Sequence, residues 1–259
     1  MKIGFIGLGH MAGSILHALS QNGEYEFYVN DHHEDRLLAL KKKLGDRFSI
    51  SSYKDILASC PFVFLGVKPK DMSELLFGIK GLPSQVIVSM AAGYSIEEML
   101  DILGERKVIR IMPNTPVAVR SGVTFATYLN VCPIEKQQFI KMMSETGSIY
   151  EIDEEKMDTV SVLTGSTPAY LDYFLDALIE FGKSKGFTEE ESKEYVLKMA
   201  RGTIDLNISS SKSPLELGKE VCSPGGSTIE GVNLLEEKGF RNMVKDAAEA
   251  SYQKTKKMK

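Results

Sequence analysis

The turn Ser223-Pro224-Gly225-Gly226-Ser227-Thr228 has the residue types and spacing that most directly indicate chemistry, and a helical pattern follows it at once. Pro224 suits the entry to a helix. Gly225 and Gly226 allow the backbone to come close to a ligand because they carry no side chain. The open N–H groups and the positive dipole end of the following helix favour a carboxylate or a phosphate. The turn is therefore a candidate site for a small anion.

The helix after this turn has to orient those N–H groups towards the anion. Ser227 or Thr228 is expected to cap it. Its buried stripe is expected to consist of apolar residues at three-residue spacing, namely Ile229, Val232 and Leu235. A plain loop with a capped helix behind it explains the same residues, so the turn alone does not establish a ligand site.

A second candidate site lies at the amino terminus. The strand-like run Lys2–Ile6 leads into Gly7-Leu8-Gly9-His10-Met11-Ala12, and a helical pattern of apolar residues follows. In such a loop the first glycine makes a tight turn, the second admits a pyrophosphate, and the small last residue lets the helix pack on the strand. Its place between a strand and a helix predicts a dinucleotide site.

The residues that distinguish NAD from NADP are expected directly after the second strand, Tyr25–Asn30. These residues are Asp31, His32 and His33. Asp31 would hydrogen-bond a ribose 2′-hydroxyl and repel a 2′-phosphate, which favours NAD. Protonated His32 and His33 would instead favour NADP, and as plain solvated residues they would favour neither. The residues leave both cofactors open.

Three later strand patterns end in polar or small residues. Phe62–Gly66 leads to Val67-Lys68-Pro69, Val86–Ser89 leads to Ala91-Ala92-Gly93, and Val108–Met112 leads to Pro113-Asn114-Thr115-Pro116. Ligands of open α/β folds collect at the carboxyl ends of strands, where Lys68 is a candidate for ribose or phosphate and the alanines would admit a flat ring. Together with the glycine loop, these strand ends outline one nicotinamide site.

The composition is that of a globular protein, with 259 residues, 43% hydrophobic, 25% charged and a net charge of -4. An acidic chain is not expected to bind nucleic acid or an anionic membrane. Cys60, Cys132 and Cys222 form neither a pair nor a metal-ligand pattern, so no disulfide scaffold and no metal site are expected. The start is too brief for a signal peptide and no apolar run approaches about 18 residues, so we expect the cytoplasm.

A change of pattern near residue 152 predicts two domains. Strand patterns continue to Ser148–Ile152, whereas helical patterns run almost without interruption from Asp153. We expect residues 1–152 to form an α/β Rossmann domain with a mostly parallel sheet, followed by an all-α dimerisation domain over residues 153–259. Thr164–Tyr170 is expected to kink or restart the helix.

Six motifs occur in this order along the chain: Gly7-Leu8-Gly9-His10-Met11-Ala12, Val67-Lys68-Pro69, Ala91-Ala92-Gly93, Met112-Pro113-Asn114-Thr115-Pro116, Pro168-Ala169-Tyr170 and Ser223-Pro224-Gly225-Gly226-Ser227-Thr228. Their order and spacing resemble the pyrroline-5-carboxylate reductase family over nearly the whole length. The fourth and sixth motifs are the most specific, far more so than the glycine loop alone.

The resemblance implies reduction of Δ1-pyrroline-5-carboxylate to L-proline with NADPH or NADH, the last step of proline biosynthesis. It also implies a homodimer whose active site is completed across the dimer, and in some members five dimers form a decamer. The substrate carboxylate would dock on backbone N–H groups, and Thr228 would be the catalytic hydroxyl closest to the ring nitrogen. The implied substrate-binding residues are Ser223, Gly225, Gly226, Ser227 and Thr228. The implied cofactor-binding residues are Gly7, Leu8, Gly9, His10, Met11, Ala12, Asn30, Asp31, Val67, Lys68, Pro69, Ala91, Ala92 and Asn114.

Three departures from the family pattern leave alternatives open. Asp31 stands where many members have Arg, Gly66 where Ala is common, and Thr167 where Gly usually precedes the proline. A paralogue acting on another small imino or keto acid, or a non-catalytic regulator with the same fold, would also fit. A β-hydroxyacid dehydrogenase fits less well, because Gly165–Leu171 lacks the catalytic lysine that such an enzyme needs.

Overall fold

The structure, a computed structural model, describes residues 1–83 and 85–257. The chain forms two compact units: a first unit of Met1–Gly165 with Tyr252–Lys259, and a second unit of Ser166–Ser251. The first unit contains the sheet, whereas the described residues of the second unit form helices and the loops between them. The domain boundary expected after residue 152 stays a prediction.

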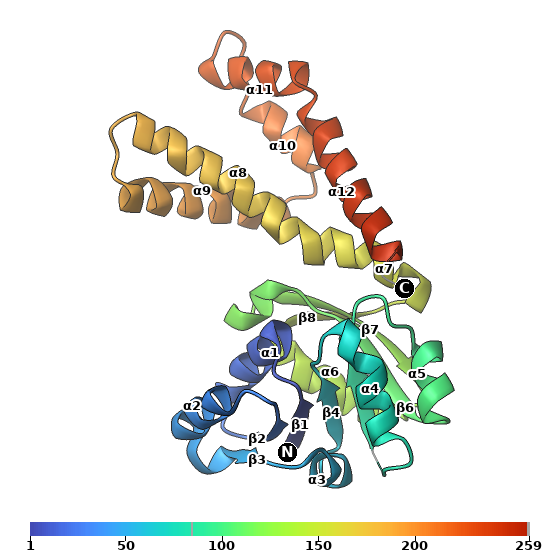
Figure 1. The fold of residues 1–259 in the computed structure, drawn as a ribbon. Coiled ribbons are helices and arrows are strands. Elements are labelled where there is room, and N and C mark those ends of the chain that lie inside the picture. The colour runs from blue at the N-terminus through green and yellow to red at the C-terminus, as the bar shows by residue number, and fades with distance from the viewer. Residues whose placement is uncertain (84, 258–259) are drawn as a thin grey trace. The chain divides into compact units, whose positions relative to one another are not determined.

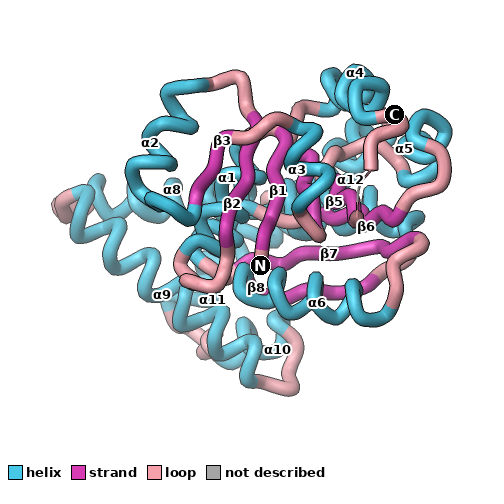
Figure 2. Tube along the Cα trace, turned by 90° about the horizontal axis from the view of Figure 1, so that it is seen from below, coloured by secondary structure: helices cyan, strands magenta, loops and turns pink. Residues whose placement is uncertain are grey.

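The first unit is built on one eight-stranded sheet (Figures 1 and 2). Its strands are β1 (Lys2–Ile6), β2 (Glu26–Asn30), β3 (Phe48–Ile50), β4 (Phe62–Leu65), β5 (Val86–Ser89), β6 (Lys107–Met112), β7 (Gly122–Leu129) and β8 (Gly147–Glu151). The order across the sheet is β3-β2-β1-β4-β5-β6-β7-β8, and β6 and β7 are antiparallel while the other neighbours are parallel. The predicted Rossmann domain with a mostly parallel sheet is confirmed.

The strand order reverses beside β1, which pairs with β2 on one side and β4 on the other. Ile6 at the end of β1 is level with Asn30 of β2 and Leu65 of β4. The loops after these three strands therefore leave the sheet from the same edge, at the kind of crevice where doubly wound folds bind ligands. The ends of β5 and β6 lie at this edge too, since both strands continue the parallel arrangement from β4.

Helices connect the strands of the first unit. They are α1 (His10–Ser20), α2 (Glu34–Leu44), α3 (Tyr53–Ser59), α4 (Pro69–Ile79), α5 (Ile96–Leu103), α6 (Pro133–Met143) and α7 (Met157–Val160). Short 3₁₀ segments are η1 (Gly45–Arg47), η2 (Thr115–Val119), η3 (Ser144–Thr146) and η4 (Glu154–Lys156). The sequence patterns predicted β1, β2, β4, β5, β6 and β8 to within a few residues, but they did not identify β3, α4 or α5.

The sheet is buried on both faces, which explains why its inner strands read as continuous apolar runs. In β4, Phe62 and Phe64 pack with α1, α2 and α6 on one face. Val63 and Leu65 pack with α3, α4 and α5 on the other. Side chains alternate between the two faces because a strand has a two-residue period. The two apolar layers keep the strands in place, so that their carboxyl ends lie at one edge of the sheet.

The second unit consists of α8 (Thr167–Ser184), α9 (Glu189–Ser209), α10 (Pro214–Glu220), α11 (Ser227–Glu237) and most of α12 (Phe240–Lys256). A π-helical segment, η5 (Ser161–Ser166), precedes α8, so the interruption expected at Thr164–Tyr170 occurs as a change of helix type. Helices α8 and α9 approach closely at Gly182, where a Cβ would lie 2.6 Å from the Ser192 hydroxyl.

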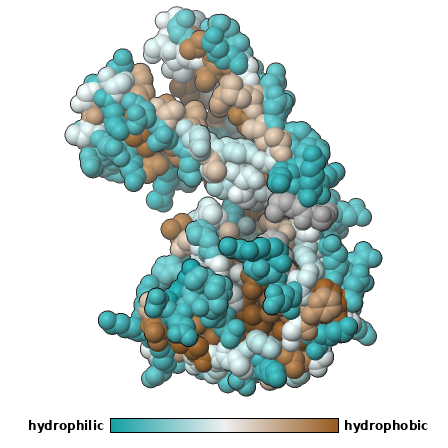
Figure 3. All heavy atoms as spheres, in the orientation of Figure 1, coloured by the Kyte–Doolittle hydropathy of each residue, from teal (hydrophilic) through white to brown (hydrophobic). Residues whose placement is uncertain are grey.

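Large apolar side chains reach the surface of the second unit, as Figure 3 shows among its helices. Those exposed include Leu171, Tyr173, Phe174, Phe181, Phe187, Tyr195, Leu197, Met199, Ile204, Leu206, Ile208, Leu215, Leu234, Leu235 and Met243. The stripe of α11 that was expected to be buried is not, because no described residue of α11 is buried within this chain. Exposed apolar faces of this extent indicate contact with another protein surface. None of the described helices is long and apolar enough to span a bilayer.

Candidate active site

The glycine loop joins β1 to α1 and lies against the end of β4. Gly7 has a φ of +84°, which favours glycine, and a Cβ there would lie 2.8 Å from the Val67 side chain. Gly9 is the N-cap of α1, and a Cβ there would lie 2.9 Å from the Gly66 oxygen. No described side chain caps α1 and its first turn holds no acidic residue, so its N–H groups are open to an anion.

Backbone hydrogen bonds fix this loop between two strands. Gly7 N donates to Asn30 O at 2.8 Å, and Gly66 N donates to Ile6 O at 2.8 Å. A Cβ on Gly66 would overlap the Gly7 oxygen and lie 2.5 Å from the Ala12 Cβ. The departure from alanine at Gly66 is thus explained by the close packing of this loop.

Asp31 follows β2 and turns its carboxylate towards the glycine loop. Its Oδ2 accepts a hydrogen bond from Leu8 N at 2.5 Å, and its Oδ1 accepts one from His33 N at 2.8 Å. The Oδ1 also lies 2.8 Å from His33 Nδ1. Burial raises the pKa of Asp31, but the hydrogen bonds from Leu8 and His33 outweigh it and hold the pKa below its ordinary value. The carboxylate therefore joins the glycine loop to His33, and Asp31 also lines an open cavity.

Two open cavities flank Asp31. One, of about 410 Å³, is lined by residues from the ends of β1 and β2 and from α3 and α4, among them Gly7, Tyr53 and Leu75. The other, of about 580 Å³, is lined by residues 32–36. Arg36 belongs to the second cavity, and its Nη1 donates a hydrogen bond to the Leu8 oxygen. Patterns in the sequence did not single out Arg36, which is the third residue of α2.

The other predicted cofactor residues follow β4, β5 and β6. Lys68 is the N-cap of α4, which begins at Pro69. Ala91 is buried, and its N–H donates to the Ser89 hydroxyl at 3.4 Å. Asn114 is also buried, and its Oδ1 accepts a hydrogen bond from Val123 N at 2.8 Å, which ties the loop after β6 to the start of β7. The structure places all the predicted cofactor residues in the first unit at one sheet edge.

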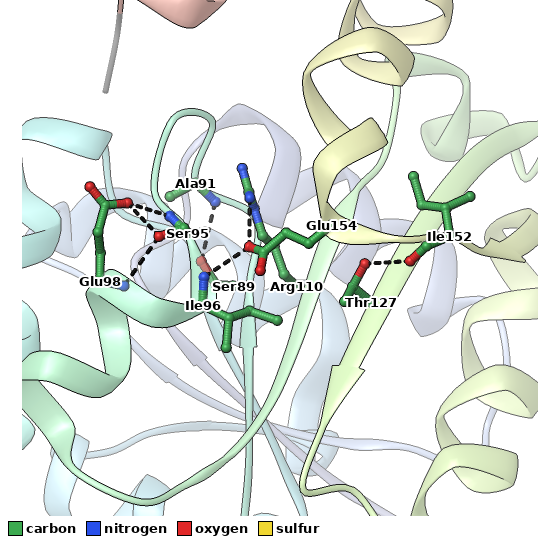
Figure 4. A network of polar contacts seen from close by, with 9 residues as sticks. All are labelled: Ser89, Ala91, Ser95, Ile96, Glu98, Arg110, Thr127, Ile152 and Glu154. Carbon is green, nitrogen blue, oxygen red and sulfur yellow. Dashed lines mark hydrogen bonds and ion pairs between the residues drawn. The ribbon is translucent and has the colours of Figure 1, made fainter.

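A buried ion pair, which sequence reasoning missed, supports these loops (Figure 4). Arg110 of β6 has a side chain only 3% exposed, and its Nη1 donates to Glu154 Oε1 at 2.7 Å. The same oxygen accepts the Ile96 N–H at the start of α5 at 2.8 Å. Glu154 begins η4, and its carboxylate joins this segment to β6 and α5.

The predicted anion turn lies in the second unit, between α10 and α11. Gly225 has a φ of +72°, and Gly226 N donates to Ser223 O at 3.0 Å. The prediction that Ser227 or Thr228 caps the helix is wrong, because Gly226 is the N-cap and no described side chain accepts its first N–H groups. Without such an acceptor, the N–H groups at the start of α11 are open to an anion, and Ser227 and Thr228 are exposed beside them.

Two family models match this chain. Residues 154–258 match pyrroline-5-carboxylate reductase dimerisation, and residues 2–93 match NADP oxidoreductase coenzyme F420-dependent. A pyrroline-5-carboxylate reductase of Aquifex aeolicus is 35% identical over 100% of this chain and 97% of the relative. The chain belongs to the pyrroline-5-carboxylate reductase family.

Solved structures of pyrroline-5-carboxylate reductases have the same fold. The pyrroline carboxylate reductase of Plasmodium falciparum, solved with NADP bound, matches with a TM-score of 0.91 at 28% identity, covering 100% of this chain and 98% of that one. The Streptococcus pyogenes 1-pyrroline-5-carboxylate reductase matches with a TM-score of 0.90 at 30% identity, covering 99% and 98%. The resemblance seen in six sequence motifs is confirmed over the full chain.

Proposed function

We propose that this protein is an NAD(P)H-dependent oxidoreductase that reduces Δ1-pyrroline-5-carboxylate to L-proline, the last step of proline biosynthesis. The observation that carries the proposal is the full-length similarity to pyrroline-5-carboxylate reductases of several organisms, at 29–35% identity for the bacterial relatives of Aquifex aeolicus, Escherichia coli and Bacillus subtilis. The open glycine loop and the open start of α11 agree with it, since one suits a pyrophosphate and the other a carboxylate.

The residues of this chain have to bind and align rather than to supply strong acid chemistry. When bound, the nicotinamide supplies the hydride that reduces the carbon–nitrogen double bond. The N–H groups of Gly225–Thr228 hold the substrate carboxylate by charge-assisted hydrogen bonds, with Ser223 beside them. Ala91 and Ala92 leave room for a flat ring, and the fixed side chain of Asn114 orients the loop next to it. A protonated imine is already an electrophile, so positioning is the main contribution.

Thr228 is the proposed catalytic residue. Its hydroxyl is exposed in the first turn of α11 and is not used as a helix cap, so it is free to orient the ring nitrogen or relay a proton to it. We expect Thr228→Ala to lower kcat about tenfold or more and to leave the thermal midpoint nearly unchanged. Ser210→Ala, on a loop of the same unit, is the matched control. Equal kinetics for Thr228→Ala and the unmodified protein would remove Thr228 from the mechanism.

The proposal extends to assembly and location. The exposed apolar faces of the second unit and its match to a dimerisation model support a homodimer, which in turn is the building block of a decamer. The three free cysteines support a reducing compartment, the cytoplasm. Small imino acids are the proposed partners rather than nucleic acid or membranes, in keeping with the net charge of -4.

The activity is tested with purified protein, Δ1-pyrroline-5-carboxylate and either NADPH or NADH, by following absorbance at 340 nm and identifying proline as the product. We expect oxidation of the nicotinamide that depends on the substrate. Oxidation with other cyclic imino or keto acids alone would identify a paralogue of different specificity. No oxidation with any of these substrates, while the cofactor still binds, would identify a non-catalytic regulator and refute the proposed activity.

A further inference from the structure

The loop between β5 and α5, residues 90–95, is fixed by a side chain at each end. At its start, Ala91 N donates a hydrogen bond to the Ser89 hydroxyl at 3.4 Å. At its end, Ile96 N donates one to Glu154 Oε1 at 2.8 Å. This second acceptor lies 58 residues further along the chain, so the position of the loop depends on the segment after β8.

Glu154 binds a second group with the same oxygen, the guanidinium of Arg110 (Figure 4). Arg110 Nη1 lies 2.7 Å from Glu154 Oε1, and the Arg110 side chain is only 3% exposed. Its Nε and Nη2 have no hydrogen-bond partner within the described part of the chain. The buried guanidinium therefore depends on this one carboxylate, because an unpaired charge in the interior is costly. One oxygen thus ties β6 to the start of α5.

An apolar contact supports the same loop from the same segment. Helix α7 follows η4 directly, and its residues Met157 and Val160 form a buried cluster with Met112 at the end of β6. Ala92 of the loop packs against this cluster. The segment formed by η4 and α7 therefore holds the loop twice, through the Glu154 carboxylate and through apolar packing.

We propose that Arg110 and Glu154 are positioning residues for hydride transfer, which they support by holding residues 90–95 in place. This inference rests on the proposed function, in which Ala91 and Ala92 of this loop leave room for the nicotinamide ring. Neither positioning side chain needs to touch the reacting atoms. A displacement of about 1 Å lowers the rate of such a step by up to about 100-fold. Cofactor binding is expected to change much less, because the glycine loop holds the pyrophosphate.

The kinetic test uses Glu154→Gln, which keeps the shape of the side chain and removes its charge. Protein loaded with reduced cofactor is mixed with excess Δ1-pyrroline-5-carboxylate, and the absorbance of the first turnover is followed by stopped flow. The rate constant reports hydride transfer, whereas the amplitude counts folded, loaded sites. We expect Glu154→Gln to lower the rate constant by about 10- to 100-fold and to change the cofactor KM by less than about threefold. Glu155→Gln removes the same charge from the exposed neighbouring position and should change neither value.

Arg110→Lys tests the other side of the pair. It keeps the buried positive charge but lacks the planar fork of the guanidinium, so we expect the rate constant to fall here too. A purely structural role of the pair predicts a different pattern, a smaller amplitude with an unchanged rate constant. That pattern in every variant of the pair that folds would overturn the inference.

Fluorescence of the bound reduced nicotinamide tests the position of the loop without turnover. The emission of this ring depends on its surroundings, and it is recorded with saturating cofactor and no imino acid. We expect Glu154→Gln to change the emission intensity while the dissociation constant of the cofactor changes by less than about threefold, and Glu155→Gln to change neither. Absence of turnover in the unmodified protein would refute the proposed activity and leave this measurement valid. Unaltered emission in both Glu154→Gln and Arg110→Lys would overturn the positioning role itself.

Discussion

At the scale of single residues, Gly66 shows how a departure from a family pattern can be a packing requirement. Its Cβ position is filled by the Gly7 oxygen and the Ala12 Cβ, so the end of β4 touches the loop after β1. A sequence cannot reveal this contact, because the two segments meet only through the β1–β4 pairing. The small residues on both sides are therefore one feature that has to be changed or kept together.

We expect Gly66→Ala to lower the free energy of unfolding by about 1–3 kcal/mol, because the glycine loop has to move to admit the methyl group. Cofactor affinity should fall with it. Gly13→Ala is the matched control, since no described atom lies within 4 Å of a Cβ there and alanine favours a helix interior. Urea denaturation of both variants checks the prediction, and equal stability of Gly66→Ala and the unmodified protein would contradict it.

Asp31 predicts a dependence of stability on pH. Because its pKa is held below the ordinary value in the folded protein, its ionised form stabilises the fold above that ordinary value, and the stabilisation is lost as the pH falls through the lowered pKa. Asp31→Asn should therefore reduce stability by about 2 kcal/mol at neutral pH and by much less in acid. Denaturation at neutral pH and at about pH 3 measures the difference. A gap that stayed constant with pH would show that ionised Asp31 gives no such stabilisation.

At the scale of elements, the sequence predicted best where a short apolar run is followed by a glycine or a proline. Strands β1 and β5 and the boundaries of β4 and β6 were identified in this way. Helices α4 and α5 were missed because each directly follows a loop that was read only for its ligand chemistry. Long-range contacts were harder still: Ser95 caps α5 locally, but Glu154 accepts the Ile96 N–H from 58 residues away in the chain.

The Glu154 contact predicts a stability effect at this scale. Removing its carboxylate leaves the Arg110 guanidinium buried without its ion-pair partner and the Ile96 N–H without its acceptor. We expect Glu154→Ala to lower the free energy of unfolding by about 3 kcal/mol. Glu155→Ala, at the exposed neighbouring position, should change it by less than about 0.5 kcal/mol. Similar thermal midpoints for the two variants would contradict a structural role for the Arg110–Glu154 pair.

At the scale of the whole molecule, the two units differ in how far they bury their apolar residues. The first unit buries them on both faces of the sheet, as its strand patterns predicted. The second unit leaves a stripe of α9 exposed, formed by Leu197, Ile204 and Ile208 at spacings of seven and four. Helical periodicity identified the apolar stripe of α11 but wrongly predicted that it is buried within this chain, because periodicity cannot tell whether a stripe packs within its own chain or on another.

We expect Ile208→Asp to weaken self-association, because it places a charge on a side chain that is 78% exposed in the single chain. Light scattering over a range of protein concentrations should show a smaller mean mass for this variant. Ile134→Asp, at an exposed position on α6 of the first unit, is the control and should keep the mass of the unmodified protein. An unchanged mass for Ile208→Asp would place the contact elsewhere.

Two side chains bind the backbone of Leu8: its N–H donates a hydrogen bond to the Asp31 carboxylate, and its carbonyl oxygen accepts one from the Arg36 guanidinium. Both side chains belong to the short stretch after β2, so a change in that stretch reaches the turn between β1 and α1 through the Leu8 backbone alone.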